Sequence, residues 1–246
     1  MPFAVVTRDV EAAAPYATAL AALGLDVVAM PVTRTAPPDD PGALVRALER
    51  DGYAAIVVAS QRAAEALLLA RGHAHLPEVW AVGPATARRL AQGHIAAIVP
   101  DGVRDGATLA SALVAQRELA GKRVLLPRAE DGRDEAAELI RAAGAEVDDV
   151  IAYRTVAAGE DDPAIARGRD LLATGQAAVC AVFAPSQVAA LDALAPVRNL
   201  ATRFVAIGET TAGALRDAGA AVAGVAASPT PEGIANAVAA VYPPKR

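Results

Sequence analysis

A glycine followed by two threonines stands directly after a short apolar run. Residues 204–207 are typical of a strand, and the apolar residues beyond them recur with helical spacing, so Gly208 marks the change from strand to helix. We interpret the missing side chain of Gly208 as allowing a tight turn, and place Thr210 and Thr211 in the first helical turn. Because a helix N-terminus carries unpaired N–H groups and a positive dipole end, this segment predicts a site for an anionic ligand.

A second copy of this segment lies 125 residues earlier. At that offset (208 − 83 and 211 − 86), Gly83 corresponds to Gly208 and Thr86 corresponds to Thr211. Further matches are Ala59-Ser60-Gln61 with Pro185-Ser186-Gln187 at an offset of 126, and Val6-Thr7-Arg8 with Leu126-Pro127-Arg128 at an offset of 120. The chain therefore consists of two related units, each about half its length.

Strand and helix patterns alternate along the whole chain, which is typical of parallel sheets covered by helices. The expected strands are residues 3–6, 25–30, 54–58, 79–82, 96–99, 123–126, 146–156, 179–183, 204–207 and 221–225. The expected helices are residues 10–23, 42–51, 61–70, 107–117, 134–143, 164–173 and 186–194, one after each of the two glycines, and a last one from residue 231. Such sheets bind ligands at the carboxyl ends of their strands, where the glycine–threonine segments lie.

Two connectors differ from the others and predict where the two units join. Residues 31–37 open a proline-rich segment, and residues 150–157 end the long strand of the second repeat. If both connectors cross between domains, they form a hinge beside a cleft. Domain 2 then comprises residues 37–150, and the discontinuous domain 1 comprises residues 1–33 and 157–246.

Bulk composition excludes several kinds of partner and site. The chain has 23 basic and 28 acidic side chains and eight aromatic residues (one Trp, four Tyr, three Phe), which argues against nucleic acid. A single cysteine excludes an internal disulfide and fits a reducing compartment. No apolar stretch reaches the roughly 18 residues of a membrane span and no signal-peptide core is present, so we expect a cytoplasmic protein. Neither a metal-ligand cluster nor a nucleotide-binding glycine motif occurs, so we expect no metal and no cofactor.

Short motifs follow one another in a fixed order along nearly the whole chain. They are residues 6–8, 59–66, 82–86, 126–128, 132–133, 151–155, 183–186, 206–211 and 228–232. In this order they resemble the uroporphyrinogen-III synthase family. The resemblance implies an α/β fold of two flavodoxin-like parallel-sheet domains joined by a two-stranded linker, with the site in the cleft between them. The family's hydroxyl residue is absent at two places, Ala59 and Ala184.

The resemblance also implies the chemistry. The family closes the linear tetrapyrrole hydroxymethylbilane into uroporphyrinogen III without a cofactor, losing water and inverting the last pyrrole ring. Because this substrate closes unaided to the symmetric isomer, the enzyme must orient the last ring more than supply a strong acid or base. The implied partners are the small-molecule substrate and, transiently, hydroxymethylbilane synthase, with the chain itself a monomer. The alternative from another class is a non-catalytic two-domain binding or sensor protein for an anionic small molecule.

The candidate site residues follow from the motifs. Tyr153 is the candidate catalytic residue, because the family motif places a tyrosine there and a phenol can donate a proton to a departing hydroxyl. The candidate substrate-binding residues are Arg8, Ser60, Arg62, Gly83, Thr86, Arg128, Ser186, Gly208, Thr210 and Thr211. Several have a purely structural alternative: Ser60, Ser186 and Thr86 as helix caps or first-turn residues, Arg62 as a surface charge, and Tyr153 as one more strand aromatic. Arg8 and Arg128, directly after strands, and Thr210 and Thr211, after the glycine, favour a functional role.

Overall fold

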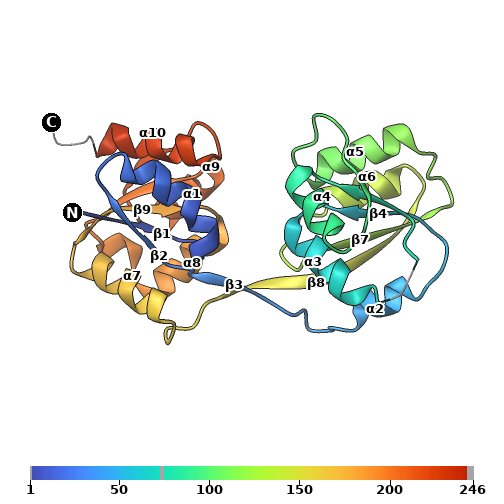
Figure 1. Ribbon diagram of the computed structural model, residues 1–246, viewed down its shortest axis with the longest axis horizontal. Coiled ribbons are helices and arrows are strands. Elements are labelled where there is room, and N and C mark those ends of the chain that lie inside the picture. Colours follow the sequence, from blue (N-terminus) through green and yellow to red (C-terminus); the bar gives the residue numbers. More distant parts are fainter. Residues whose placement is uncertain (1, 73–74, 243–246) are drawn as a thin grey trace. The chain divides into compact units, whose positions relative to one another are not determined.

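The computed structural model describes residues 2–72 and 75–242, and its chain divides into two compact units (Figure 1). Unit 1 comprises Met1–Arg34 and Val156–Arg246, and unit 2 comprises Thr35–Thr155. The divisions fall inside two strands, β3 (Thr33–Ala36) and β8 (Glu146–Ala157). Among the described residues, no helix is both long and apolar enough to cross a membrane.

Unit 1 is a five-stranded parallel sheet with helices on both faces. Its order is β2-β1-β9-β10-β11, the strand order of flavodoxin-like sheets. The strands are β1 (Phe3–Val6), β2 (Asp26–Ala29), β9 (Ala177–Val182), β10 (Arg203–Ala206) and β11 (Val222–Val225). The helices are α1 (Val10–Ala21), α7 (Pro163–Ala173), α8 (Pro185–Leu194), α9 (Glu209–Asp217) and α10 (Pro231–Val241), with a 3₁₀ turn at Val197–Asn199.

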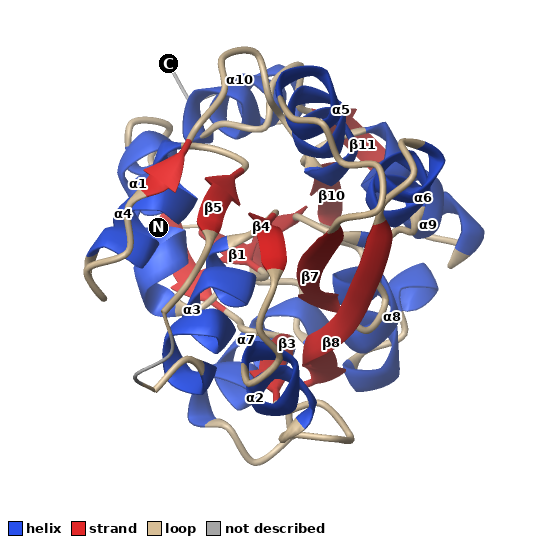
Figure 2. Ribbon diagram, turned by 90° about the vertical axis from the view of Figure 1, so that its right-hand side faces the viewer, coloured by secondary structure: helices blue, strands red, loops and turns tan. Residues whose placement is uncertain are grey.

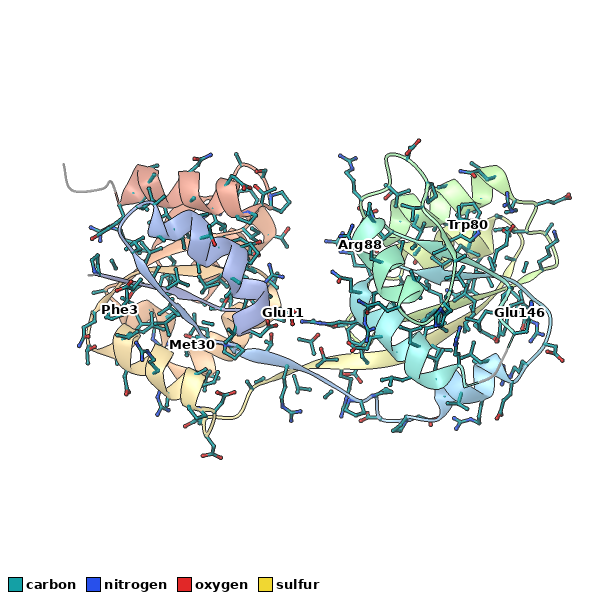
Figure 3. The ribbon with its side chains drawn as sticks, viewed as in Figure 1. Phe3, Glu11, Met30, Trp80, Arg88 and Glu146 are labelled. Atoms are coloured by element: carbon teal, nitrogen blue, oxygen red, sulfur yellow. The ribbon has the colours of Figure 1, made fainter. Side chains whose placement is uncertain are left out.

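Two hydrophobic clusters hold these layers together, one on each face of the sheet. One face packs against α1 and α10 through Tyr16, Leu20 and Ile234. The other packs against α7, α8 and α9. There Met30 and Gly168 approach so closely that a Cβ on the glycine would lie 2.6 Å from the methionine Cγ (Figure 3 labels Met30). A side chain at position 168 would therefore push α7 off the sheet.

Unit 2 repeats this architecture with its strands in a different chain order. Its six-stranded sheet runs β3-β8-β7-β4-β5-β6, and β8-β7-β4-β5-β6 correspond in position to the five strands of unit 1. The remaining strands are β4 (Tyr53–Val58), β5 (Glu78–Ala81), β6 (Ala97–Ile98) and β7 (Arg123–Ala129). The helices are α2 (Ala43–Leu48), α3 (Gln61–Ala70), α4 (Pro84–Ala91), α5 (Gly106–Gln116) and α6 (Glu135–Ala142).

The faces of this second sheet are again covered by separate sets of helices (Figure 2). Leu44, Leu67 and Leu90 bring α2, α3 and α4 onto one face. The fully buried Trp80 lies in the cluster of the opposite face, which α5 and α6 cover. Burial of this one indole removes on the order of 200 Å² from water, which makes it a major contributor to the stability of unit 2.

The expected α/β class and the alternation of strands and helices are confirmed, with most element ends within two residues of those predicted. The helix at 61–70 and the long strand from residue 146 are found as expected. The proline-rich segment differs, because it contains the strand β3, whose residues Thr33–Ala36 lie between its prolines and are free of them. The hinge proposed for residues 31–37 and 150–157 stays a prediction.

Cys180 lies in β9 and is fully buried, as expected for a packing residue. Burial raises the pKa of its thiol to about 12, so the reactive thiolate is scarce in the folded chain. We therefore expect a thiol reagent such as dithiobis(nitrobenzoate) to leave the native protein unlabelled for hours at pH 8, and to label one thiol per chain at once in denaturant. Fast native labelling would mean that β9 opens readily.

Candidate functional site

The strand order of each sheet contains one place where successive connections leave in opposite directions. This place lies between β7 and β4 in unit 2 and between β1 and β9 in unit 1. In open parallel sheets the loops separate there beyond the carboxyl ends of the strands and leave a crevice for a ligand.

In unit 2, a pocket of about 390 Å³ lies at the carboxyl ends of β4 and β7. Ser60 and Tyr153 both line it, and their hydroxyl oxygens are 3.1 Å apart, within hydrogen-bonding distance. The position of Ser60 is fixed, because its Oγ also caps α3 by accepting a 3.0 Å hydrogen bond from the Ala63 N–H. This serine is thus both a helix cap and the partner of the tyrosine.

An irregularity in β8 directs Tyr153 to the pocket. The register between β7 and β8 passes from Arg128 opposite Ile151 to Ala129 opposite Tyr153, which leaves Ala152 as an extra residue in β8. Such bulges turn the following side chain and are common beside active sites. Backbone pairing resumes at once, since the Tyr153 carbonyl accepts a 3.0 Å hydrogen bond from the Glu130 N–H. The phenol is thereby held on rigid backbone.

Arg128 also lines the pocket, but its guanidinium is largely engaged within the protein. Nε donates to Asp149 at 2.6 Å, and Nη2 donates to Asp134 at 3.0 Å. Nη1 donates to the carbonyls of Ala129 and Gly132 at 3.2 and 2.9 Å. The hydrogen bond to Asp149 raises the pKa of Arg128, so the charge is permanent. Four of its five N–H groups therefore have acceptors in the loop after β7 and in β8.

These bonds predict that Arg128 stabilises unit 2 more than it binds a ligand. We expect Arg128→Leu to lower the free energy of unfolding by about 2 kcal/mol, because Asp149 and the loop carbonyls lose their donor in a mostly buried setting. Arg89→Leu is the matched control: its ion pair with Glu65 is exposed and should cost about 0.5 kcal/mol. Urea unfolding measures both. Equal stability of the two variants, with weaker ligand binding by the first alone, would contradict this role.

Tyr153 also lines a second pocket, of about 360 Å³. This pocket is lined mainly by prolines and aliphatic side chains from α2, α3 and the segment 35–41, and its charged lining residues are Arg62 and Glu65. Arg62 is exposed. The predicted residues Ser60, Arg62, Arg128 and Tyr153 thus gather around two adjoining pockets of unit 2.

The two glycine–threonine segments begin α4 and α9, with Gly83 and Gly208 as the N-caps. The prediction that glycine is needed here for a tight turn is wrong. Their φ values, 177° and −176°, are extended backbone that any residue adopts, so no tight turn requires glycine. A Cβ added at either would meet no atom within 4 Å from the described residues other than its own chain neighbours. Each glycine therefore leaves open space above uncapped N–H groups.

Thr86 and Thr211 occupy the third position of these helices and are each only 3% exposed. Within residues 2–72 and 75–242, neither hydroxyl has a hydrogen-bond partner. Every side-chain N or O atom that is fully shielded from solvent in these ranges does have a partner. Each hydroxyl oxygen therefore keeps some contact with solvent at the start of its helix. Thr210 is exposed in the same turn of α9.

In unit 1, Arg8 follows β1 and lies at the carboxyl end of the sheet, while Ser186 lies in the first turn of α8. The expected correspondence of Ser186 with Ser60 is wrong: α3 is capped by Ser60 and α8 by Ala184, an offset of 124 (184 − 60) instead of 126. The shared Ser-Gln pair suggested a wrong alignment, because Ser60 stands directly before its helix, whereas Ser186 is the second residue of its helix. Ser186 is exposed and is not a cap.

The predicted residues divide between the units. Arg8, Ser186, Gly208, Thr210 and Thr211 belong to unit 1, and Ser60, Arg62, Gly83, Thr86, Arg128 and Tyr153 belong to unit 2. Within the described ranges, no group of three or more His, Cys, Asp or Glu side chains could hold a metal ion. Tyr16 and Phe183, which lie against Arg8, and Gln187, which is bonded to Thr7 and Phe183, were missed as site residues, because only the folded chain brings these residues together.

Comparisons with known proteins bear on the family and the fold of the chain. A family model described as uroporphyrinogen-III synthase HemD (HEM4) matches residues 14–236. A solved uroporphyrinogen-III synthetase from Helicobacter pylori is 15% identical, with 96% of this chain and 97% of that one covered at a TM-score of 0.63. A mutant uroporphyrinogen III synthase from Thermus thermophilus is 22% identical, with 92% of each chain covered at a TM-score of 0.55. No curated protein matches. At these identities the solved structures establish the fold.

Proposed function

The chain belongs to the uroporphyrinogen-III synthase family, and on this premise we propose that it cyclises hydroxymethylbilane to uroporphyrinogen III. The reaction removes the substrate's hydroxyl as water, closes the macrocycle and inverts the last pyrrole ring. It makes the protein a cyclising hydro-lyase of tetrapyrrole and heme biosynthesis that needs no cofactor.

The observation that carries this proposal is the Ser60–Tyr153 hydroxyl pair in the pocket at the carboxyl ends of β4 and β7. The Tyr153 phenol donates a proton to the leaving hydroxyl as the carbon–oxygen bond breaks, and the electron pair of the neighbouring pyrrole nitrogen stabilises the resulting cation. Such a leaving group needs only a weak acid. Ser60, held as a helix cap, fixes the phenol oxygen from one side.

The substrate's carboxylates require donors from a protein with five more acidic than basic side chains. The helix starts at Gly83–Thr86 and Gly208–Thr211 supply them in our proposal, since both combine uncapped N–H groups, an accessible threonine hydroxyl and open space. Arg8, Arg62, Thr210 and Ser186 add side-chain donors. Fixed donors of this kind orient the substrate, and orientation decides which carbon of the last ring meets the cation.

The test is the isomer composition of the product. Purified protein is incubated with freshly prepared hydroxymethylbilane, and the products are oxidised to uroporphyrins and separated by chromatography. We expect the type III isomer to predominate, against type I in the protein-free control. A non-catalytic binding or sensor protein would leave the type I product or unreacted substrate. Transient contact with hydroxymethylbilane synthase and a monomeric state stay predictions, which sedimentation with and without that enzyme would test.

A further inference from the structure

Arg8 has an environment unlike that of the other strand-end arginine. Its guanidinium carbon lies 5.0 Å from the ring centre of Phe183 and 5.5 Å from that of Tyr16. These two rings pack edge to face with their centres 4.7 Å apart. Nη1 also donates a 3.1 Å hydrogen bond to the Tyr16 hydroxyl. Two aromatic rings and one hydrogen bond therefore hold the guanidinium in place without neutralising it.

No carboxylate among the described residues pairs with Arg8, and the Tyr16 hydroxyl is its one side-chain hydrogen-bond acceptor there. Arg128, its counterpart at the offset of 120, is instead bound by two carboxylates and two carbonyls. At the same position of the repeat, the guanidinium of unit 2 is thus bound by carboxylates of the protein, and that of unit 1 is not. A cation held without a counter-ion at a strand end favours an anionic ligand.

Gln187 supplies a second oriented donor beyond the end of β9, the strand that pairs with β1. Its Oε1 accepts a 2.7 Å hydrogen bond from the Thr7 hydroxyl and a 3.0 Å hydrogen bond from the Phe183 N–H. Thr7 directly precedes Arg8 in the chain, and the Phe183 ring lies against the Arg8 guanidinium. The Gln187 amide therefore lies at the same strand ends as Arg8. The Phe183 N–H can only donate, so it fixes Oε1 as the acceptor, and the Nε2 hydrogens point away from it and have no acceptor in residues 2–72 and 75–242.

We propose that Arg8 and Gln187 form a carboxylate-binding site at the carboxyl ends of β1 and β9, with Tyr16 and Phe183 as positioning residues for the guanidinium. The ligand is one carboxylate of the polycarboxylate tetrapyrrole, so the identity of the ligand rests on the proposed function. Planar guanidinium and amide N–H groups match the two oxygens of a carboxylate. The start of α8, where Ala184 offers no side-chain acceptor, adds its dipole at the same carboxyl edge of the sheet.

The decisive variant is Gln187→Glu. A glutamate keeps one oxygen for the Thr7 hydroxyl and the Phe183 N–H, but it replaces the outward NH₂ with a second carboxylate oxygen. Gln176→Glu is the matched control, because it adds the same charge to unit 1 at the exposed residue just before β9, the opposite end of that strand. The probe is uroporphyrin I, a stable porphyrin with the carboxylate side chains of the substrate, titrated by fluorescence at low ionic strength.

We expect Gln187→Glu to raise the Kd for uroporphyrin I at least tenfold and Gln176→Glu to change it less than twofold. Equal Kd values for both folded variants would overturn the site. If Gln187→Glu fails to fold by circular dichroism, Arg8→Met replaces it, since it keeps a long apolar stem between the rings; an unchanged Kd there also overturns the site. Turnover of hydroxymethylbilane by the parent protein is measured separately, so failure of the proposed function is distinguished from failure of this site.

Discussion

Gly208→Ala is expected to slow the formation of uroporphyrinogen III by about 10- to 100-fold without unfolding the protein. A Cβ at this position meets no protein atom within 4 Å, so the folded chain has room for it. The same space lies over the uncapped N–H groups at the start of α9, where we place a substrate carboxylate. Losing one or two charge-assisted hydrogen bonds costs about 1.5–3 kcal/mol, which corresponds to this range of rates.

The stability of the variant should change by less than about 1 kcal/mol. Alanine is a poorer N-cap than glycine, but it also restricts the unfolded chain, and the two effects oppose each other. Gly213→Ala is the matched control, since Gly213 lies in the same helix and a Cβ there also meets no protein atom within 4 Å. We expect that control to keep full activity and to gain slightly in helix stability.

Gly83→Ala makes the same test in unit 2, at the start of α4. Initial rates at saturating and limiting hydroxymethylbilane separate the effect on KM from the effect on kcat. If the alanine variants at positions 83 and 208 have parental kinetics, the open spaces over the glycines are not where carboxylates bind. A loss of activity in Gly213→Ala as well would indicate a general disturbance of α9.

The layers of this fold could be predicted from the sequence, because the alternation of strands with helices and the spacing of apolar residues are local properties of the chain. Buried parallel strands appear as short apolar runs, and the helices between them carry their apolar residues on one face. The strand β3 was not predicted, because the prolines around Thr33–Ala36 dominate the local sequence pattern. Its pairing with β8 exists only in the folded chain. The bulge at Ala152 likewise depends on the register of two strands.

The site could be predicted in its residue types more than in their roles. Arg8 and Arg128 are equivalent by sequence, yet within the described residues only Arg128 is bound by carboxylates. Its partners Asp134 and Asp149 come from a loop and a strand that no local pattern connects. Gly208 was predicted as a site residue on the wrong ground, a tight turn, because the presence of a glycine does not reveal its backbone dihedral angles. Gln187 was missed because the orientation of its amide depends on Thr7, 180 residues away.

Tyr153→Phe is expected to lower kcat by about 10²-fold, in the lower range for general acid catalysis, with KM nearly unchanged. The phenol donates to the leaving hydroxyl only as the carbon–oxygen bond breaks, so its loss affects the transition state more than substrate binding. Tyr53→Phe is the matched control, because it removes a phenol from the same sheet that is bound by Asp148 and lies outside both pockets around Tyr153. That control should lose stability but keep its rate.

The isomer composition of the slow product then separates two roles of Tyr153. If the phenol acts only as the acid, the residual product is still mainly type III, because the carboxylate donors orient the last ring. Release of the type I isomer would instead show that the phenol holds the ring, and a parental rate would leave Tyr153 a packing residue. Ser60→Gly refines the test: glycine is an adequate N-cap but cannot hold the phenol, so we expect a smaller loss than in Tyr153→Phe. In the double variant the two losses should not add, since Ser60 acts through the hydroxyl that the first change removes.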